Sequence, residues 1–283
     1  MERSMDTEKK ATRRTILKTG LASVAAAAVE TAAVHGAQST GYRKAAGETK
    51  IVAVMGDYWH PAVSQETHVR EIFSANRDWK IYFVQASRFF TPALIEDADL
   101  LITARYGGAD SIGWTDEPVV LSRPAGDQIW TDDQVGAVFD NVRNRGMGWM
   151  AVHCTLFAGR EDVEDFIGIE PVLHQEIQPV IVRDLNPDHP VTRGIDTFFI
   201  SLDEQFDAQI KDPSSTTILF RTLAVHDKRN AVGGWCLERG KGRVVGLLPG
   251  HYQWTYRAPE YQEIFRRAAY WAMNRDIPPF NKG

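Results

Sequence analysis

The chain has 283 residues, of which 43% are apolar and 24% are charged, a composition typical of a soluble globular protein with one large domain or two small ones. The net charge of −5 gives no basic surface and argues against nucleic acid as a partner. Two cysteines, Cys154 and Cys236, are too few for a disulfide framework. They could form one disulfide in an oxidising compartment or remain buried as thiols.

The first forty residues differ from the rest of the chain. They carry Arg13 and Arg14, then an alanine-rich apolar stretch, then small residues. This order predicts a twin-arginine export signal over residues 1–37, followed by a linker over residues 38–49; the alternative is a disordered tail with a chance arginine pair. The apolar stretch is interrupted by Glu30 and is too weakly apolar to span a bilayer. We expect a periplasmic or secreted protein that makes no membrane contact after the signal is removed.

From residue 50 onward, strand-like segments alternate with helical ones. Apolar runs predict strands over residues 50–56, 79–86, 99–105 and 148–153. Helical spacing and end signals, such as a first-turn proline, predict helices over residues 67–75, 91–98 and 131–146. This alternation predicts a parallel sheet with helices on both faces. In such a sheet the ligand site lies beyond the carboxyl ends of the strands.

After residue 170 the pattern changes to successive strands. They are predicted over residues 176–184, 198–207, 216–222, 232–239 and 242–250. A closing helix then carries one apolar stripe, formed by Tyr261, Ile264, Phe265, Ala268 and Trp271. We expect an antiparallel extension of the same sheet, and therefore a single domain over residues 50–283. The sequence leaves the oligomeric state open, including a homo-oligomer.

Three histidines follow predicted strands and could meet at one edge of the sheet. His60 follows the first strand, His153 ends the fourth and His251 follows the last. Neutral imidazoles are good ligands for Zn²⁺, Mn²⁺ or Fe²⁺ and good acid–base groups near neutral pH. No His-x-His or His-x-x-x-His spacing supports a metal site, so the alternative is that each histidine only makes a local hydrogen bond.

Carboxylates and one arginine also fall near this edge. On a strand, Asp203 and Glu204 point to opposite faces, so one could face the site and the other solvent, unless both lie on a solvated edge strand. Asp57 follows the first strand and could contact a sugar hydroxyl or cap the next segment. Arg105, at the end of the third strand, could stabilise a developing oxyanion or form a surface salt bridge.

Aromatic residues gather around the same predicted edge. They are Tyr58, Trp59, Tyr106, Trp114, Phe157, Tyr252 and Trp254. Sugar rings stack their apolar faces on such side chains, whereas ordinary core packing is the alternative. We take Asp57, Trp59, Arg105, Tyr106 and Tyr252 as candidate substrate contacts, and a small-molecule carbohydrate as the expected partner.

Cys154 directly follows His153 and raises the question of a nucleophilic thiol. A nucleophile on a strained strand-to-helix turn usually has small residues two positions before and after it, but here these are Val152 and Leu156. A histidine base would also need an orienting acid, and Gln253 stands two residues after His251. The sequence therefore disfavours a cysteine triad.

Six motifs in order carry a family resemblance. They are "VMGDYWHP", "GMGWMAVH", "HPVTRGI", "DEQF", "GKGRVVGLLPGH" and the closing "YWA". Together they resemble the trehalose-utilisation (ThuA-like) family over roughly residues 50–275. The resemblance implies a class I glutamine amidotransferase-like fold, that is, a flavodoxin-like three-layer α/β sandwich. It also implies a role in carbohydrate metabolism, often beside oxidoreductases that make 3-oxo-glycosides.

The resemblance also carries residues. His60, His153 and His251 match the family's motif histidines, Glu204 matches the acid of its Asp-Glu motif, and Cys154 stands where a serine is more usual. We therefore expect an exported enzyme that acts on a sugar or 3-oxo-glycoside by acid–base chemistry of His153, Glu204 and His251.

This chemistry would serve an isomerase, lyase or hydrolase, with a divalent metal on the three histidines as a further expectation. A non-catalytic carbohydrate-binding protein and a thiol-dependent hydrolase using Cys154 are the alternatives.

Overall fold

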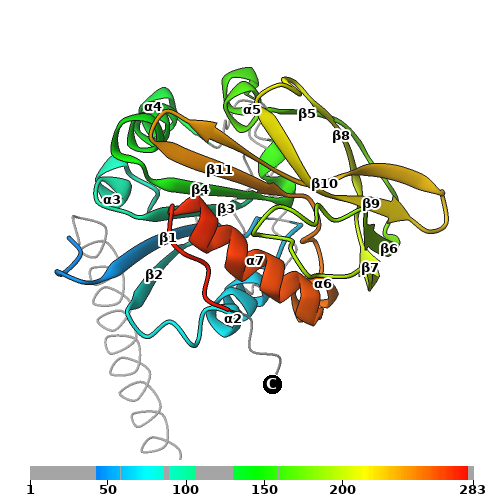
Figure 1. Cartoon of the computed structure of the whole chain (residues 1–283). Helices are drawn as coiled ribbons and strands as arrows, with labels where there is room; N and C mark the ends of the chain where they lie inside the picture. Colours follow the sequence, from blue (N-terminus) through cyan, green and yellow to red (C-terminus); the bar gives the residue numbers. More distant parts are fainter. Residues whose placement is uncertain (1–42, 58, 86–88, 106–129, 158–159, 280–283) are drawn as a thin grey trace, which may run out of the picture. The chain divides into compact units, whose positions relative to one another are not determined.

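A nine-stranded sheet forms the centre of the part of the chain that the structure describes (Figure 1). The structure is a computed structural model and describes residues 43–57, 59–85, 89–105, 130–157 and 160–279. The expected export signal, and Tyr58, Tyr106 and Trp114, lie outside these ranges. Within them, no helix has the length and apolar character needed to cross a membrane.

Five parallel strands form one half of the sheet, in the order β2, β1, β3, β4, β11. Their bounds are β1 Thr49–Met55, β2 Trp79–Val84, β3 Leu100–Ala104, β4 Gly148–Val152 and β11 Gly242–Leu247. Three of them, β1, β3 and β4, are buried along their whole length, as parallel strands covered on both faces must be. The first four expected strands are confirmed, each ending one or two residues earlier than expected.

Helices cover both faces of this half and complete a flavodoxin-like three-layer sandwich. One face carries α2 Ala62–Ile72, α6 Gln253–Arg257 and α7 Pro259–Ala272. The other carries α3 Pro92–Ile95, α4 Asp132–Asp140 and α5 Glu161–Ile167. A capping box at Thr131 begins α4, and a π-helical turn, Asn141–Arg145, extends it to Gly146.

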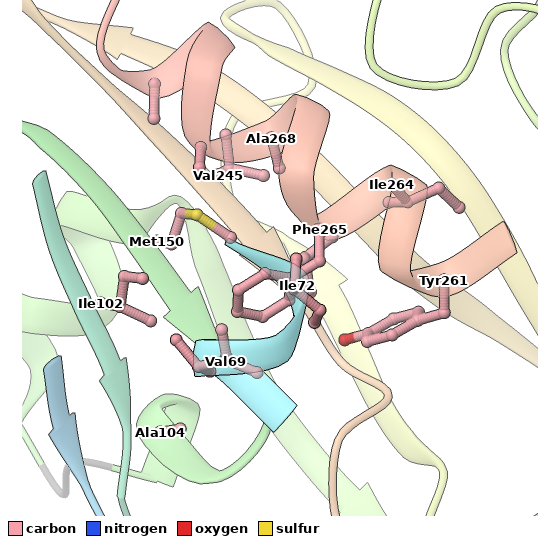
Figure 2. Packing of buried hydrophobic residues seen from close by; sticks show 14 of the residues in the cluster. Val69, Ile72, Ile102, Ala104, Met150, Val245, Tyr261, Ile264, Phe265 and Ala268 are labelled. Carbon is pink, nitrogen blue, oxygen red and sulfur yellow. The ribbon is translucent and has the colours of Figure 1, made fainter. Parts of the chain in front are cut away.

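The core under α7 is formed by the helix stripe that the sequence predicts (Figure 2). Tyr261, Phe265 and Ala268 are buried against α2 and the sheet. Trp271 is half-buried and packs against the edge of the same core, and the guanidinium of Arg243 stacks on its ring at 4.8 Å. The predicted stripe is therefore confirmed.

The antiparallel half continues the sheet in the order β10, β9, β6, β7. These strands are β10 Arg229–Arg239, β9 Thr216–Ala224, β6 Gln178–Arg183 and β7 Phe198–Asp203. The single strand expected over residues 198–207 is wrong, because the chain leaves the sheet after Asp203. It then forms β8 Phe206–Ile210, which pairs with β5 Ile169–His174 in a separate two-stranded sheet.

The carboxylate of Asp203 shows that the sheet curls back on itself. Three strands separate β7 from β11 in the strand order. Yet Asp203, at the end of β7, accepts hydrogen bonds of 2.9 Å from the backbone N–H groups of both Gly250 and His251, just after β11. This curl brings Glu204 to the carboxyl ends of the parallel strands.

Candidate functional site

Four side chains of metal-ligand type converge where the parallel strands end. They are His60, His153, Glu204 and His251, and one nitrogen or oxygen atom from each lies within 4.8 Å of the others. Three follow the parallel strands β1, β4 and β11, and Glu204 comes from the bend between β7 and β8. We call this set the four-residue centre. The structure thus brings together the three histidines and the acid that the sequence singled out.

The turn after β1 fixes His60 through Asp57. Gly56 has φ of 87°, in the left-handed region, and a Cβ there would lie 2.3 Å from that of Ala62, so only glycine fits. Asp57 then caps the turn by accepting from the backbone N–H groups of Trp59 and His60 at 2.8 and 3.1 Å. Its carboxylate also lies 2.7 Å from His60 Nδ1, and the buried Nε2 of the same ring has no hydrogen-bond partner among the described residues. Asp57 is therefore a cap and a support for His60.

His153 sits on the most constrained backbone of the site. Its φ of 48° places it in the left-handed region, which costs a non-glycine residue roughly 1–2 kcal/mol. Its Nδ1 donates to the carbonyl of Leu248 at 2.8 Å, so Nε2 of the neutral ring is an acceptor. That nitrogen lies 3.2 Å from Nδ1 of His251. The strained turn after β4 thus presents the histidine, with the cysteine one position beyond it.

His251 is held by its backbone. Besides the two N–H groups after β11, Asp203 accepts from Thr255 Oγ1 at 2.7 Å. Gly250 has φ of 154°, and a Cβ there would come within 3.2 Å of His153 Cβ and Val152 Cγ1. The buried Asp203 and the missing side chain at Gly250 therefore set His251 against His153. The alternative of a solvated edge strand at Asp203 is wrong.

Glu204 supplies the negative charge of the centre. Its Oε2 lies 3.2 Å from His251 Nδ1 and 3.5 Å from His153 Nε2. Burial alone would raise the pKa of Glu204, but hydrogen bonds from His153 and His251 outweigh it and hold the pKa below its ordinary value. Burial also lowers the pKa of His60, although Asp57 opposes this, so the His60 ring tends to stay neutral. An ionised carboxylate thus lies against the rings of His153 and His251.

The spacing of these atoms fits a bound cation. Two ligand atoms at about 2.1 Å from one ion lie about 3.0 Å apart in octahedral geometry and about 3.4 Å apart in tetrahedral geometry. The three contacts among His153, Glu204 and His251 measure 3.2, 3.2 and 3.5 Å. His60 adds a buried Nε2 that no described donor satisfies. The donor set, three imidazoles and one carboxylate, is one that Zn²⁺, Mn²⁺ or Fe²⁺ accepts.

Cys154 belongs to a second cluster that is hydrogen-bonded. Asp57, His60 and Cys154 also lie within reach of one another. However, Asp57 and His60 Nδ1 are 2.7 Å apart, a hydrogen-bond distance too short for two ligands of one ion. The Cys154 thiol donates to Asp57 Oδ2 at 3.6 Å, and burial raises its pKa. Both Cys154 and Cys236 are buried and free, so the two cysteines form no disulfide with each other.

The remaining candidates lie around the centre at different depths. Arg105 is buried and donates to the carbonyls of Gly56 and Gln85 at 2.6 and 2.9 Å, so the alternative of a surface salt bridge is wrong. Trp59 is exposed and Tyr252 is half-buried beside His251, with ring centroids 4.5 Å apart. Tyr106 lies outside the described residues.

Sequence reasoning missed His174, which contacts the centre from β5. Its Nδ1 lies 3.0 Å from Glu204 Oε1. No strand was expected at 169–174, because the run is short, exposed and contains Pro171. The only available signal was a histidine just before the strand expected from residue 176.

Comparisons with known proteins agree with this architecture. The model of the ThuA family, described as trehalose utilisation, matches residues 50–272. No curated protein matches the chain.

Among solved structures, a ThuA-like protein from Parabacteroides merdae has a TM-score of 0.65 at 13% identity, covering 83% of this chain and 94% of that one. A ThuA-like protein from Bacteroides uniformis has a TM-score of 0.59 at 13% identity, with 82% and 94% covered. A β-galactosidase from Rahnella sp. R3 has a TM-score of 0.51 at 10% identity and covers 81% of this chain but only 32% of that enzyme. These likenesses concern the fold. Because the family match spans most of the sequence and the fold agrees with it, the chain belongs to the ThuA (trehalose utilisation) family, which has a glutamine amidotransferase-like fold.

Proposed function

We propose that the chain is an exported enzyme of carbohydrate metabolism that binds a divalent cation at the four-residue centre and acts on a sugar or 3-oxo-glycoside. The family indicates a carbohydrate-related role. The observation that carries the proposal is the convergence of one carboxylate and three imidazoles, with a buried His60 Nε2 among them that no described residue satisfies. Hydrogen-bond acceptors that are packed this closely are stabilised in a folded protein when they bind a cation in common.

The exposure of each side chain in the four-residue centre indicates which residues hold the cation and which transfer protons. A bound cation would polarise a carbonyl oxygen and stabilise the enediolate that forms when a neighbouring C–H loses its proton. A 3-oxo group makes that C–H acidic, so the protein must supply a base. The side chains of His60 and His153 are 5% and 0% exposed, whereas those of Glu204 and His251 are 14% and 12% exposed. We therefore assign holding roles to His60 and His153, and proton transfer to Glu204 or His251.

The outer residues would bind and orient the sugar. Trp59 and Trp254 are exposed large aromatic side chains in the segments that carry His60 and His251. Their rings can stack on the apolar face of a sugar. Arg105 is held by the carbonyls at the ends of β1 and β2, so we propose that it shapes the floor of the site and its electrostatics.

Metal analysis and turnover together test this function. Purified protein, as isolated and after chelation, is assayed on a 3-oxo-glycoside and on the unmodified glycoside, with stoichiometric Zn, Mn or Fe expected before chelation. We expect chelation and His153→Ala to reduce turnover at least ~100-fold. His226→Ala, which removes an exposed histidine in the turn between β9 and β10, is the matched control. Full activity of the chelated protein and of His153→Ala would rule out the proposal.

The same experiment separates the alternatives. A carbohydrate-binding protein without catalysis would bind the sugar, lose affinity in Trp59→Ala and turn over neither glycoside. A thiol-dependent hydrolase would be inactivated by iodoacetamide, which the burial of Cys154 and its bond to Asp57 argue against.

Export is a separate part of the proposal. It depends on Arg13 and Arg14 and the apolar stretch that follows. Replacing both arginines by lysine should retain the precursor inside the cell, whereas the unchanged chain is recovered outside the cytoplasm. Equal distribution of the two forms would argue against a twin-arginine signal.

A further inference from the structure

We infer that His174 is a positioning residue that holds Glu204 in its metal-binding orientation and closes the solvent-facing side of the four-residue centre. The inference rests on the proposed function and adds a fifth residue, which is a fourth histidine, to the site. It starts from the two oxygens of Glu204. Oε2 faces His153 and His251, whereas Oε1 lies 3.0 Å from Nδ1 of His174, which is within ion-pair distance.

Each of the three histidines of the centre has a hydrogen-bond partner on the side away from the other members. Asp57 holds His60, the carbonyl of Leu248 holds His153, and Asp203 holds the backbone of His251. Such outer partners fix the orientation of metal ligands and their loss typically costs 10–100-fold in metal affinity. For Glu204 the corresponding partner is His174, which lies next to Oε1. Glu204 directly follows the end of a strand, so this contact restrains the rotation of its side chain.

The local fold explains why His174 stays in place although its side chain is 60% exposed. It ends β5 and lies opposite Phe206 in the pairing with β8. The ring of Phe206 packs against those of His153 and His174, with centroids 4.5 and 6.0 Å away. The next residue, Gln175, donates from its backbone to Gln205 at 2.8 Å and from its amide to Asp207 at 2.9 Å. Strand β5 is thus fastened to the chain on the carboxyl side of Glu204.

Exposure places His174 at the open side of the centre. His60 and His153 lie deep, and Glu204 and His251 are the members with exposed surface. An ion would therefore enter or leave on the side of Glu204 and His251. Because the contact with His174 restrains the side chain of Glu204 on this side, replacing His174 should speed the release of metal as well as weaken its binding.

Metal-binding measurements on full-length variants test this role without an activity assay. Co²⁺ and Zn²⁺ affinities are measured by competition with a chromophoric chelator, and Co²⁺ release is followed in excess EDTA. We expect His174→Ala to weaken binding 10–100-fold and to release Co²⁺ at least ~10-fold faster. His174→Asn should stay within about threefold of the unchanged protein, because its amide nitrogen occupies the position of Nδ1. His174→Gln, whose amide lies one atom further out, should behave like alanine, and Leu173→Ala is the control for an exposed residue of the same strand.

The outcomes separate the two levels of the proposal. If the unchanged protein binds neither ion, the proposed function and this inference both fail. If it binds them and His174→Ala has the same affinity and release rate, only the role of His174 is wrong. If asparagine is as weak as alanine, the contact with Oε1 is not what holds Glu204, and the inference is overturned.

Discussion

Charged side chains are paired differently at the two ends of the parallel strands. At the amino ends, the fully buried ammonium of Lys50 lies 2.5 Å from Asp97, and Asp99 pairs with Lys44 at 2.7 Å and with Arg275 at 3.5 Å. At the carboxyl ends, one carboxylate meets three imidazoles, and the buried Nε2 of His60 has no partner among the described residues.

The charges at the amino ends stabilise the fold, whereas those at the carboxyl ends form the candidate site. The amino-end network has oppositely charged partners within ion-pair distance, so folding alone satisfies it. In the four-residue centre Glu204 shares its contacts among imidazoles, and no described residue satisfies the buried Nε2 of His60, so folding alone satisfies this centre only in part. A substitution that removes charge should therefore cost less stability in the metal-free protein at the carboxyl ends than at the amino ends, and the following experiments test that contrast.

The largest effect is expected for Glu204→Gln at the carboxyl end. The free energy of binding a structural zinc is about 10–16 kcal/mol for four ligands, so one ligand contributes roughly 3–4 kcal/mol. We expect metal affinity to fall ~100–1,000-fold, while the metal-free protein loses less stability than it does when the partner of Lys50 at the amino end is substituted. Calorimetry of chelated protein and metal titration measure the two quantities. An equal or larger loss of stability without metal would mean that the contacts of Glu204 with His153 and His251 stabilise the fold as strongly as the amino-end pair does.

The matched substitution at the amino end is Asp97→Asn. It removes the partner of a Lys50 side chain that is 0% exposed, and breaking a buried pair costs up to about 3–5 kcal/mol. Because Asp97 is 19% exposed, we expect roughly 2–3 kcal/mol, measured by urea unfolding. Metal affinity should not change. A loss of metal binding together with stability would show that the two ends are not independent.

The sequence predicts the parallel half of the molecule well. Three of its five strands are buried along their whole length, so they appear as continuous apolar runs such as that of β1, and glycine or a polar residue marks each end. The positions of His60, His153 and His251 follow directly, because residues after parallel strands share one edge. The motifs at the first, fourth and last parallel strands therefore give three members of the centre without coordinates.

The antiparallel half is less predictable, for a physical reason. The run from Phe198 to Asp207 has one strand-like pattern, yet it forms parts of two sheets, because the carboxylate of Asp203 binds backbone groups 47 and 48 residues away. The partners of a buried carboxylate are tertiary and leave no periodic signal. His174 was missed for the same reason, since only the curl of the sheet brings β5 to Glu204.

A smaller effect is expected for the pH dependence of stability. Burial alone would raise the pKa of Asp97, but the hydrogen bonds from Lys50 and from the backbone of Lys44, together with the charge of Lys50, outweigh it and lower the pKa below its ordinary value of 3.8. A lowered pKa in the folded state means that the stabilisation is present above pH 3.8 and is lost as pH falls through the folded value. The gap in unfolding free energy between the unchanged protein and Asp97→Asn should therefore narrow by about 1 kcal/mol between pH 5 and pH 3. A constant gap would mean that Lys50 does not need a charged partner.

The smallest effect is expected for Cys154→Ser, although Cys154 directly follows His153. The serine hydroxyl can donate to Asp57 as the thiol does, so His60 keeps its support and stability should change by less than about 1 kcal/mol. Cys154→Ala removes this donor from a buried carboxylate, and should cost about 1 kcal/mol more than serine with a several-fold loss of metal affinity. Activity on a 3-oxo-glycoside should survive in the serine variant and follow metal occupancy in the alanine variant. Complete inactivation of Cys154→Ser with metal still bound would instead assign chemistry to the thiol, because that substitution preserves the hydrogen bond and removes only the sulfur.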